Sequence, residues 1–158
     1  MKKKCKLFGL AVLVTAIVFI SAACKNGSTD PDPREAYFGT WKMTFNSPRY
    51  IQVTISANSF KLNDFENNSL TSSYTITGLS WTPANGAVPN YPTGYIMKGT
   101  VTARSGGISP TKPDDSHANI GDTAVEYWFI HTGGNSLVKG RPSEPGGDVF
   151  GGVFTKQH

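Results

Sequence analysis

The sequence predicts an all-β domain, an antiparallel up-and-down β-barrel of about eight strands. Apolar and polar residues alternate in short segments from Tyr37 onward, which is the pattern of strands with one buried face. The chain also contains 17 glycines and 10 prolines, which are frequent in turns and unfavourable inside helices. A small sheet must protect its edge strands, and eight antiparallel strands can do so by closing into a barrel.

The first two strands show the clearest alternation. Residues 37–45 place Trp41 and Met43 on one face and polar side chains such as Lys42 on the other. Residues 51–56 alternate isoleucine and valine with glutamine, threonine and serine in the same way. Because successive side chains of a strand point to opposite faces, both segments are expected to bury their apolar side.

Further strands are predicted at 59–62, 73–81, 95–104, 124–131, 136–139 and 149–156. Gly133-Gly134-Asn135 forms a turn between two of them, since glycine readily adopts positive φ. Two spacers, 82–94 and 105–123, are too long for tight hairpins. Long connections in a compact domain are either functional or disordered, so these two are either binding loops at the barrel rim or surface excursions.

The N-terminal segment has the three parts of a bacterial secretory signal. Four lysines lie within the first six residues, 7–20 is apolar, and Ser21-Ala22-Ala23 precede Cys24. The apolar run of about 14 residues is shorter than the ~20 that a spanning helix needs. This arrangement resembles the lipobox of bacterial lipoproteins, with Ser21 where most lipoboxes have leucine. The resemblance implies cleavage before Cys24 and lipidation of its sulfur and amine, and an ordinary cleaved signal is the alternative.

The same resemblance divides the chain into a signal peptide (1–23), a lipidated cysteine with a flexible polar tether (24–36) and a barrel domain (37–158). We expect a membrane-anchored protein of the cell envelope, at the outer membrane. Without the signal, 11 basic and 11 acidic residues remain, so charge gives no support for binding nucleic acid. Cys24 is then the only cysteine, which excludes disulfides within the mature chain and zinc sites built from cysteines.

The first strand, Phe38-Gly39-Thr40-Trp41-Lys42-Met43, resembles the opening of the calycins, which include the lipocalins and the fatty-acid-binding proteins. In these proteins a Gly-x-Trp lies where the chain enters the barrel, and the tryptophan plugs its closed end. Gly39 and Trp41 occupy those positions. The ending Val153-Phe154-Thr155-Lys156 is similar to their last strand, which returns beside the first. A plain core position is the alternative role for Trp41.

The chain departs from both calycin families elsewhere. Residues 46–49 stand where fatty-acid-binding proteins insert a helical lid, and 141–148 cannot form the helix that precedes the last lipocalin strand. The carboxylate-binding Arg-x-Tyr of the fatty-acid-binding proteins has no counterpart. The resemblance therefore implies a lipocalin-like barrel and carries over no lipid headgroup site.

The resemblance implies an interior for a small hydrophobic ligand, and we predict that Trp41, Met43, Tyr127, Phe129 and His131 contact it. Tyr127, Trp128 and Phe129 are consecutive, so only one side of this strand can face the interior. Large aliphatic residues are few and serine, threonine and glycine are many, which favours a cavity or a flattened barrel. The alternative is a solid barrel that contacts another protein through its loops, as inhibitors and adhesins do.

Catalytic motifs are few, and we expect neither an enzyme nor a bound cofactor. Asp114-Asp115-Ser116-His117 gathers carboxylates, a hydroxyl and an imidazole, but neighbouring loop residues rarely hold the geometry of a nucleophilic site. A metal could bind there weakly, although carboxylates in such a loop are usually only solvated. His131 ends a predicted strand, where it could contact a ligand or be satisfied by the backbone.

Replacing Cys24 by serine removes the sulfur that lipidation requires. We expect Cys24→Ser protein to be released from membranes or to accumulate as an unprocessed precursor, as fractionation and immunoblotting of cells would show. Mass spectrometry of the wild-type N-terminus provides the direct measurement, and a free, unacylated Cys24 would contradict the assignment.

Overall fold

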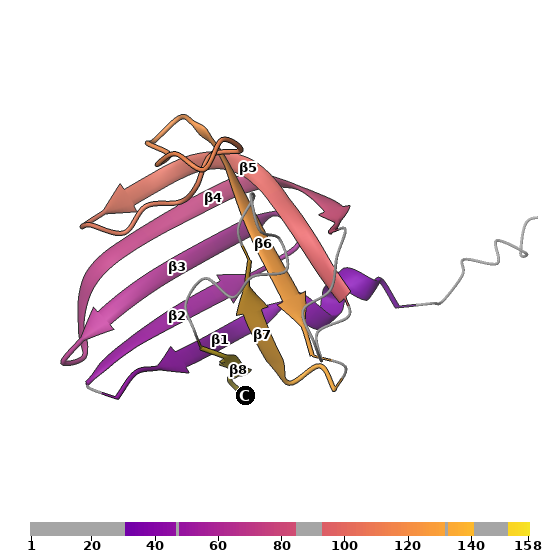
Figure 1. Cartoon of the computed structure of the whole chain (residues 1–158), viewed down its shortest axis with the longest axis horizontal. Coiled ribbons are helices and arrows are strands. Elements are labelled where there is room, and N and C mark those ends of the chain that lie inside the picture. Colours follow the sequence, from indigo (N-terminus) through magenta and orange to yellow (C-terminus); the bar gives the residue numbers. More distant parts are fainter. Residues whose placement is uncertain (1–30, 47, 85–92, 132, 141–151) are drawn as a thin grey trace, which may run out of the picture. The chain divides into compact units, whose positions relative to one another are not determined.

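The computed structural model describes residues 31–46, 48–84, 93–131, 133–140 and 152–158, and 33–158 form one compact unit. The elements are a 3-10 helix, η1 (Pro33–Tyr37), and the strands β1 (Gly39–Thr44), β2 (Arg49–Ile55), β3 (Ser59–Glu66), β4 (Ser69–Pro83), β5 (Thr93–Ser105), β6 (Thr123–Ile130), β7 (Ser136–Lys139) and β8 (Phe154–Lys156). Each strand pairs with the next in antiparallel fashion, and β8 pairs with β1, so the sheet is a closed barrel (Figure 1). The predicted architecture is confirmed. The predicted signal peptide lies outside the described residues.

The alternation in β1 and β2 puts their apolar residues inside the barrel, as predicted. Trp41 and Met43 of β1 are buried, and so are Ile51, Val53 and Ile55 of β2. In the register, Trp41 lies opposite Val53 and Met43 lies opposite Ile51. The apolar residues of the two strands therefore share one face, which a shift by one residue would turn outward.

The chain enters the barrel through Gly39, whose φ of 119° is a conformation that L side chains rarely adopt. The following Trp41 is fully buried, and its indole N–H donates to the carbonyl of Tyr37 at 2.9 Å. Nζ of Lys156 lies 5.2 Å from the centre of the Trp41 ring. Tyr37 is the last residue of η1, which occupies positions that the sequence assigned to the end of the tether and the start of a strand.

The strands β4 and β5 are longer than predicted, and each extends past the expected ends on both sides. Their pairing shifts register twice, the second time around Gly78, whose φ is 68°. Such bulges bend a strand and increase its twist, which a sheet needs in order to close. The added residues are mostly polar, so no apolar alternation marked them in the sequence.

The C-terminal strand β8 closes the barrel by pairing on both sides. Lys156 lies opposite Trp41 of β1, and Phe154 lies opposite Leu137 of β7. This confirms that the last strand returns beside the first. The predicted strand began at Val149, and the residues from 149 to 151 lie outside those described.

Emptying the Trp41 position should destabilise the barrel. We expect Trp41→Ala to lower the free energy of unfolding by about 3–5 kcal/mol, the usual cost of deleting a buried aromatic ring. Urea titration followed by circular dichroism measures this difference. Leu70→Ala is the control, because Leu70 is 53% exposed. A loss below about 1 kcal/mol for Trp41→Ala, the scale of surface substitutions, would contradict its burial.

Candidate functional site

The side of β6 that faces the interior is the opposite of the one we predicted. Trp128 points inward, since its ring centre lies 5.7 Å from that of Phe60 on β3 and 5.0 Å from that of Phe154 on β8. Tyr127 and Phe129 are its direct neighbours in the strand and therefore face outward. The interior position predicted for Tyr127 and Phe129 is wrong.

The outward-facing residues of this region have other surroundings. Phe129 is fully buried and lies against Gly94 of β5, where an added Cβ would come within 2.4 Å of its ring. Tyr127 is half-buried, and burial raises the pKa of its phenol. His131 follows the end of β6, and its Nδ1 accepts the N–H of Gly133 at 3.1 Å. The imidazole of His131 thus lies in the turn before β7, as the backbone-satisfied alternative predicted.

The most unusual feature of the interior is a buried ion pair. Glu126 of β6 is fully buried, and its Oε2 lies 2.8 Å from Nζ of Lys139 on β7. The hydroxyl of Tyr74 on β4 donates to Oε1 of the same carboxylate at 2.7 Å. The indole N–H of Trp128 donates to Oε2 at 3.2 Å, and Nζ of Lys139 donates to the Tyr74 hydroxyl at 3.3 Å. This network joins β4 to β6 and β7, with which β4 does not pair.

The hydrogen bonds explain how the barrel tolerates these charges. Removing a carboxylate or an ammonium from water costs several kcal/mol unless its polar atoms find partners. Here both oxygens of Glu126 accept hydrogen bonds. Burial raises the pKa of Tyr74 well above its ordinary value, and the negative charge of Glu126 acts in the same direction, so the phenol stays protonated as a donor. The four groups bind one another, which makes the network a structural element.

Among the described residues, large side chains pack closely around this network. The large inward residues with less than 2% exposure include Trp41, Ile51, Ile55, Phe60, Leu62, Tyr74, Ile76, Met97, Trp128 and Phe154. A side chain beside a void that admits water would have exposed surface, so these residues pack against other atoms on all sides. Trp41 and Met43 face the interior as predicted, and they do so as members of a close-packed core. Aromatic rings occupy the volume that the few aliphatic residues could not.

Aromatic rings also close the end of the barrel at η1. The ring of Tyr37 lies 5.4 Å from that of Tyr95 and 6.1 Å from that of Trp81, measured between centres. Phe38 packs edge-on against Trp81 at 5.9 Å. We call Tyr37, Phe38, Trp81 and Tyr95 the aromatic lid. Tyr37 and Tyr95 are buried, whereas Phe38 and Trp81 are half-buried and reach the surface.

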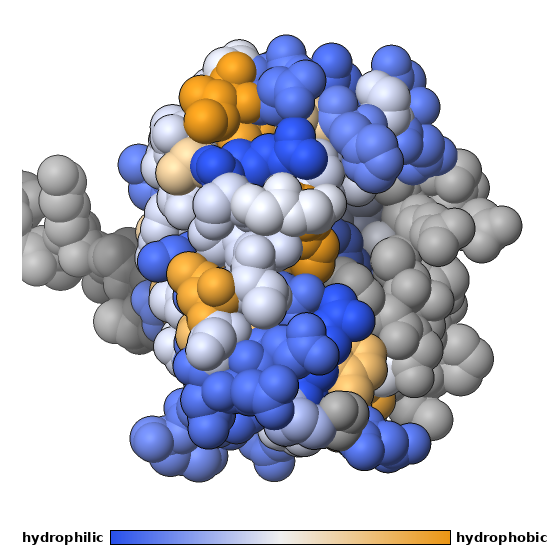
Figure 2. Space-filling model, turned by 90° about the vertical axis from the view of Figure 1, so that its left-hand side faces the viewer, coloured by the Kyte–Doolittle hydropathy of each residue, from blue (hydrophilic) through white to orange (hydrophobic). Residues whose placement is uncertain are grey.

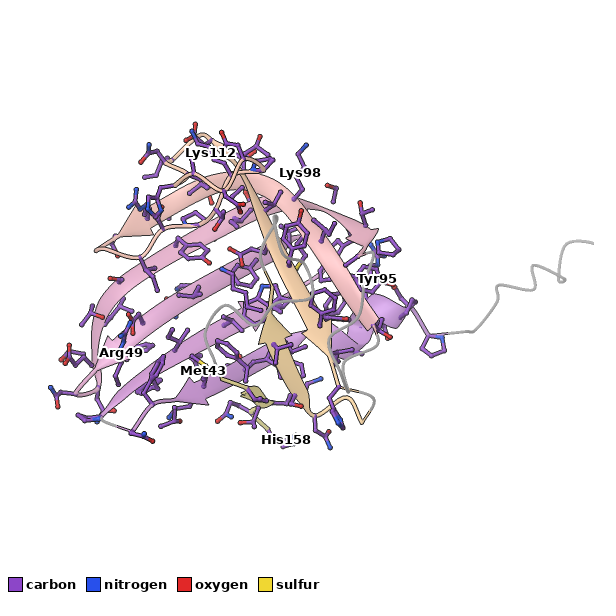
Figure 3. All side chains as sticks on the ribbon, viewed as in Figure 1. Met43, Arg49, Tyr95, Lys98, Lys112 and His158 are labelled. Carbon is purple, nitrogen blue, oxygen red and sulfur yellow. The ribbon has the colours of Figure 1, made fainter. Side chains whose placement is uncertain are left out.

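The far end of the barrel, with the β1–β2 and β3–β4 turns, carries charges instead. Arg49 donates from Nε and Nη2 to the two carboxylate oxygens of Asp64, at 3.0 and 2.8 Å. The guanidinium also lies over the ring of Phe45, 5.0 Å from its centre. Figure 3 shows Arg49 at this end and Tyr95 at the other. The two ends of the barrel therefore differ in chemistry.

The second long spacer, 105–123, also lies at the far end and is held by several contacts. Lys112 and Asp122 form an ion pair at 3.0 Å, and Thr111 forms a β-bridge with Val125 of β6. These contacts fix its position against the barrel. The spacer is thus an ordered segment of the surface, which agrees with either of the two alternatives.

An open hollow of about 560 Å³ lies where this spacer leaves β5, lined by Arg104, Ser105, Gly106, Asn119 and Ile120. Arg104 donates from Nη1 to the side-chain oxygen of Asn119 at 2.9 Å. Ile120 is 63% exposed. Figure 2 looks at the side of the barrel that carries this loop, where small apolar areas lie between hydrophilic ones. A guanidinium and an exposed aliphatic side chain therefore line the same hollow.

Asp114-Asp115-Ser116-His117 forms a turn in this spacer. Oδ1 of Asp114 accepts the Ser116 hydroxyl at 2.6 Å and its backbone N–H at 3.1 Å. These hydrogen bonds lower the pKa of Asp114. Among the residues that the structure describes, no group of three or more His, Cys, Asp or Glu side chains could hold a metal ion.

Comparisons with family models, curated proteins and solved structures find no match to this chain. In the described part of the chain, no helix has the length and apolar character needed to cross a membrane.

The buried ion pair makes a prediction about coupling. We expect Glu126→Gln and Lys139→Met each to lower the free energy of unfolding by about 3–5 kcal/mol, because each leaves the other group buried without its partner. The double variant should lose clearly less than the sum of the two single losses. Urea unfolding of all four proteins measures this difference, and strictly additive losses would show that the pair does not interact.

Proposed function

We propose that the mature chain is a non-catalytic, lipid-anchored protein of the cell envelope, whose barrel is a rigid scaffold that contacts another protein through its far end. The observation that carries this proposal is the close packing of the interior among the residues that the structure describes. A ligand-binding barrel needs a cavity. A barrel whose interior is packed with aromatic rings and an ion pair can bind a partner only at its outer surface. Anchoring follows from Cys24 and its preceding segment, which remain sequence-based.

The far end supplies a surface suited to protein contact. The hollow brings Arg104 next to Ile120, and arginine is enriched among residues that dominate protein interfaces. Ile120 is highly exposed for an aliphatic residue, and the ion pair and β-bridge of the spacer hold it in place. A positioned side chain loses less entropy on binding than one in a loose loop. We expect the partner protein to place an apolar side chain against Ile120.

The sequence favoured a small hydrophobic ligand inside a lipocalin-like barrel. Such a ligand would have to separate Trp128 from Phe60 or break the hydrogen bonds of Glu126. The first change would remove a packing contact from the core, and the second would leave polar atoms of Glu126 without hydrogen-bond partners. The interior as packed therefore supports the scaffold better than the carrier.

Probe binding separates the two functions. We expect soluble protein lacking residues 1–24 to show no saturable binding of a fluorescent fatty acid or of a small apolar probe such as benzene. Phe60→Ala is the matched control, because it empties a fully buried ring position and should create space for benzene. Stoichiometric binding of the fatty acid by the wild-type protein, reversed by natural lipids, would replace the scaffold with the carrier.

Crosslinking in living cells tests the contact surface by comparing position 120 with a control position on the barrel wall. A photo-crosslinking residue at position 120 should give one specific adduct with another protein. The same residue at position 54, an exposed site on the barrel wall, should give none. Equal labelling at both positions would show that the hollow is not a contact site.

A further inference from the structure

Apolar groups reach the surface at the end of the barrel where η1 enters. Phe38, Leu79 and Trp81 pack against the core and are each half-buried. The indole N–H of Trp81 donates to the carbonyl of Ala57 in the β2–β3 turn, at 2.9 Å, and this bond fixes the ring at the rim. We call Phe38, Leu79 and Trp81 the apolar rim.

The polypeptide connects this end to the predicted lipid anchor. Eight residues, 25–32, separate the lipidated cysteine from the start of η1. Even a fully extended chain of that length spans only about 30 Å, at ~3.3–3.6 Å per residue. Because η1 leads directly into Phe38, the apolar rim is the part of the barrel that the covalent link holds nearest to the bilayer.

The chemistry of the rim matches a bilayer surface better than the far end does. Tryptophan combines a large apolar ring with one polar N–H, and it is enriched where membranes meet water. The far end carries the Arg49–Asp64 ion pair and the Lys112–Asp122 ion pair. The half-buried rings at that end lie close to cations, because Phe45 is 5.0 Å from the Arg49 guanidinium and Tyr50 is 3.9 Å from Nζ of Lys42. At the rim, Trp81 packs edge-on against Phe38 instead.

We infer that the apolar rim rests in the lipid headgroup region of the membrane that holds Cys24. The end of the barrel at η1 then faces the bilayer. The spacer 105–123 lies on the opposite side, where a partner protein can reach it. This inference rests on the lipid anchoring of the proposed function and adds an orientation to it. The partner of the rim is the lipid surface itself.

The three tryptophans of the chain provide a selective test. Trp41 and Trp128 have no exposed surface, whereas Trp81 is half-buried at the rim, so a quencher at the membrane surface can reach Trp81 alone. The lipidated full-length protein is reconstituted into vesicles of phosphatidylethanolamine and phosphatidylglycerol. A nitroxide carried on a lipid headgroup should quench the Trp81 emission and leave the rest. Trp81→Phe should abolish the quenching.

A second variant tests the orientation from the other end. Leu70 is exposed near the β3–β4 turn, so Leu70→Trp in the Trp81→Phe background places a reporter far from the rim. Its emission should not be quenched, and near-UV circular dichroism should show that both variants keep the fold. Unquenched Trp81 in protein that floats with the vesicles, or equal quenching at position 70, would overturn the orientation alone. Protein that does not float would overturn the lipid anchor and the orientation with it.

Discussion

The rest of the barrel depends on the pairing of β8 with β1. Once these strands join, the sheet has no open edge and its inward side chains share one enclosed volume. Rings such as Trp41, Phe60 and Trp128 fill that volume in the described part of the chain. The two ends of that volume differ, because the aromatic lid lies on the η1 side and the Arg49–Asp64 ion pair lies on the other.

The ion pair inside this volume is stable only because the surrounding strands supply hydrogen-bond partners for it. Glu126 relies on Tyr74 from β4, Lys139 from β7 and Trp128 from its own strand. A change of register in any of these strands would leave a charge without a partner, at a cost of several kcal/mol. The network therefore makes strand pairing more specific. Apolar packing alone would discriminate less strictly between one register and another.

The sequence was sufficient for the fold because strands such as β1 and β2 alternate cleanly, so that Trp41 and Met43 could be assigned to the interior. It failed for β6, because Tyr127 and Phe129 make the outer side of that strand as apolar as the inner one. The decisive residue was Glu126, which is charged and yet faces inward. Its partners Tyr74 and Lys139 are distant in sequence, and no local pattern connects them. The closely packed interior was predicted only as the alternative, because aliphatic residues are few and aromatic rings take their place in the core.

Closure between the first and last strands also sets the order of events in folding. Lys42 and Thr155, which hydrogen-bond across this seam, are 113 positions apart. Contacts between such distant residues form late, because the chain must first lose the entropy of a very long loop. A chain that is synthesised from its N-terminus cannot complete the barrel until β8 has been made. Until then the edge of β1 stays open, and the chain needs protection from pairing with other strands.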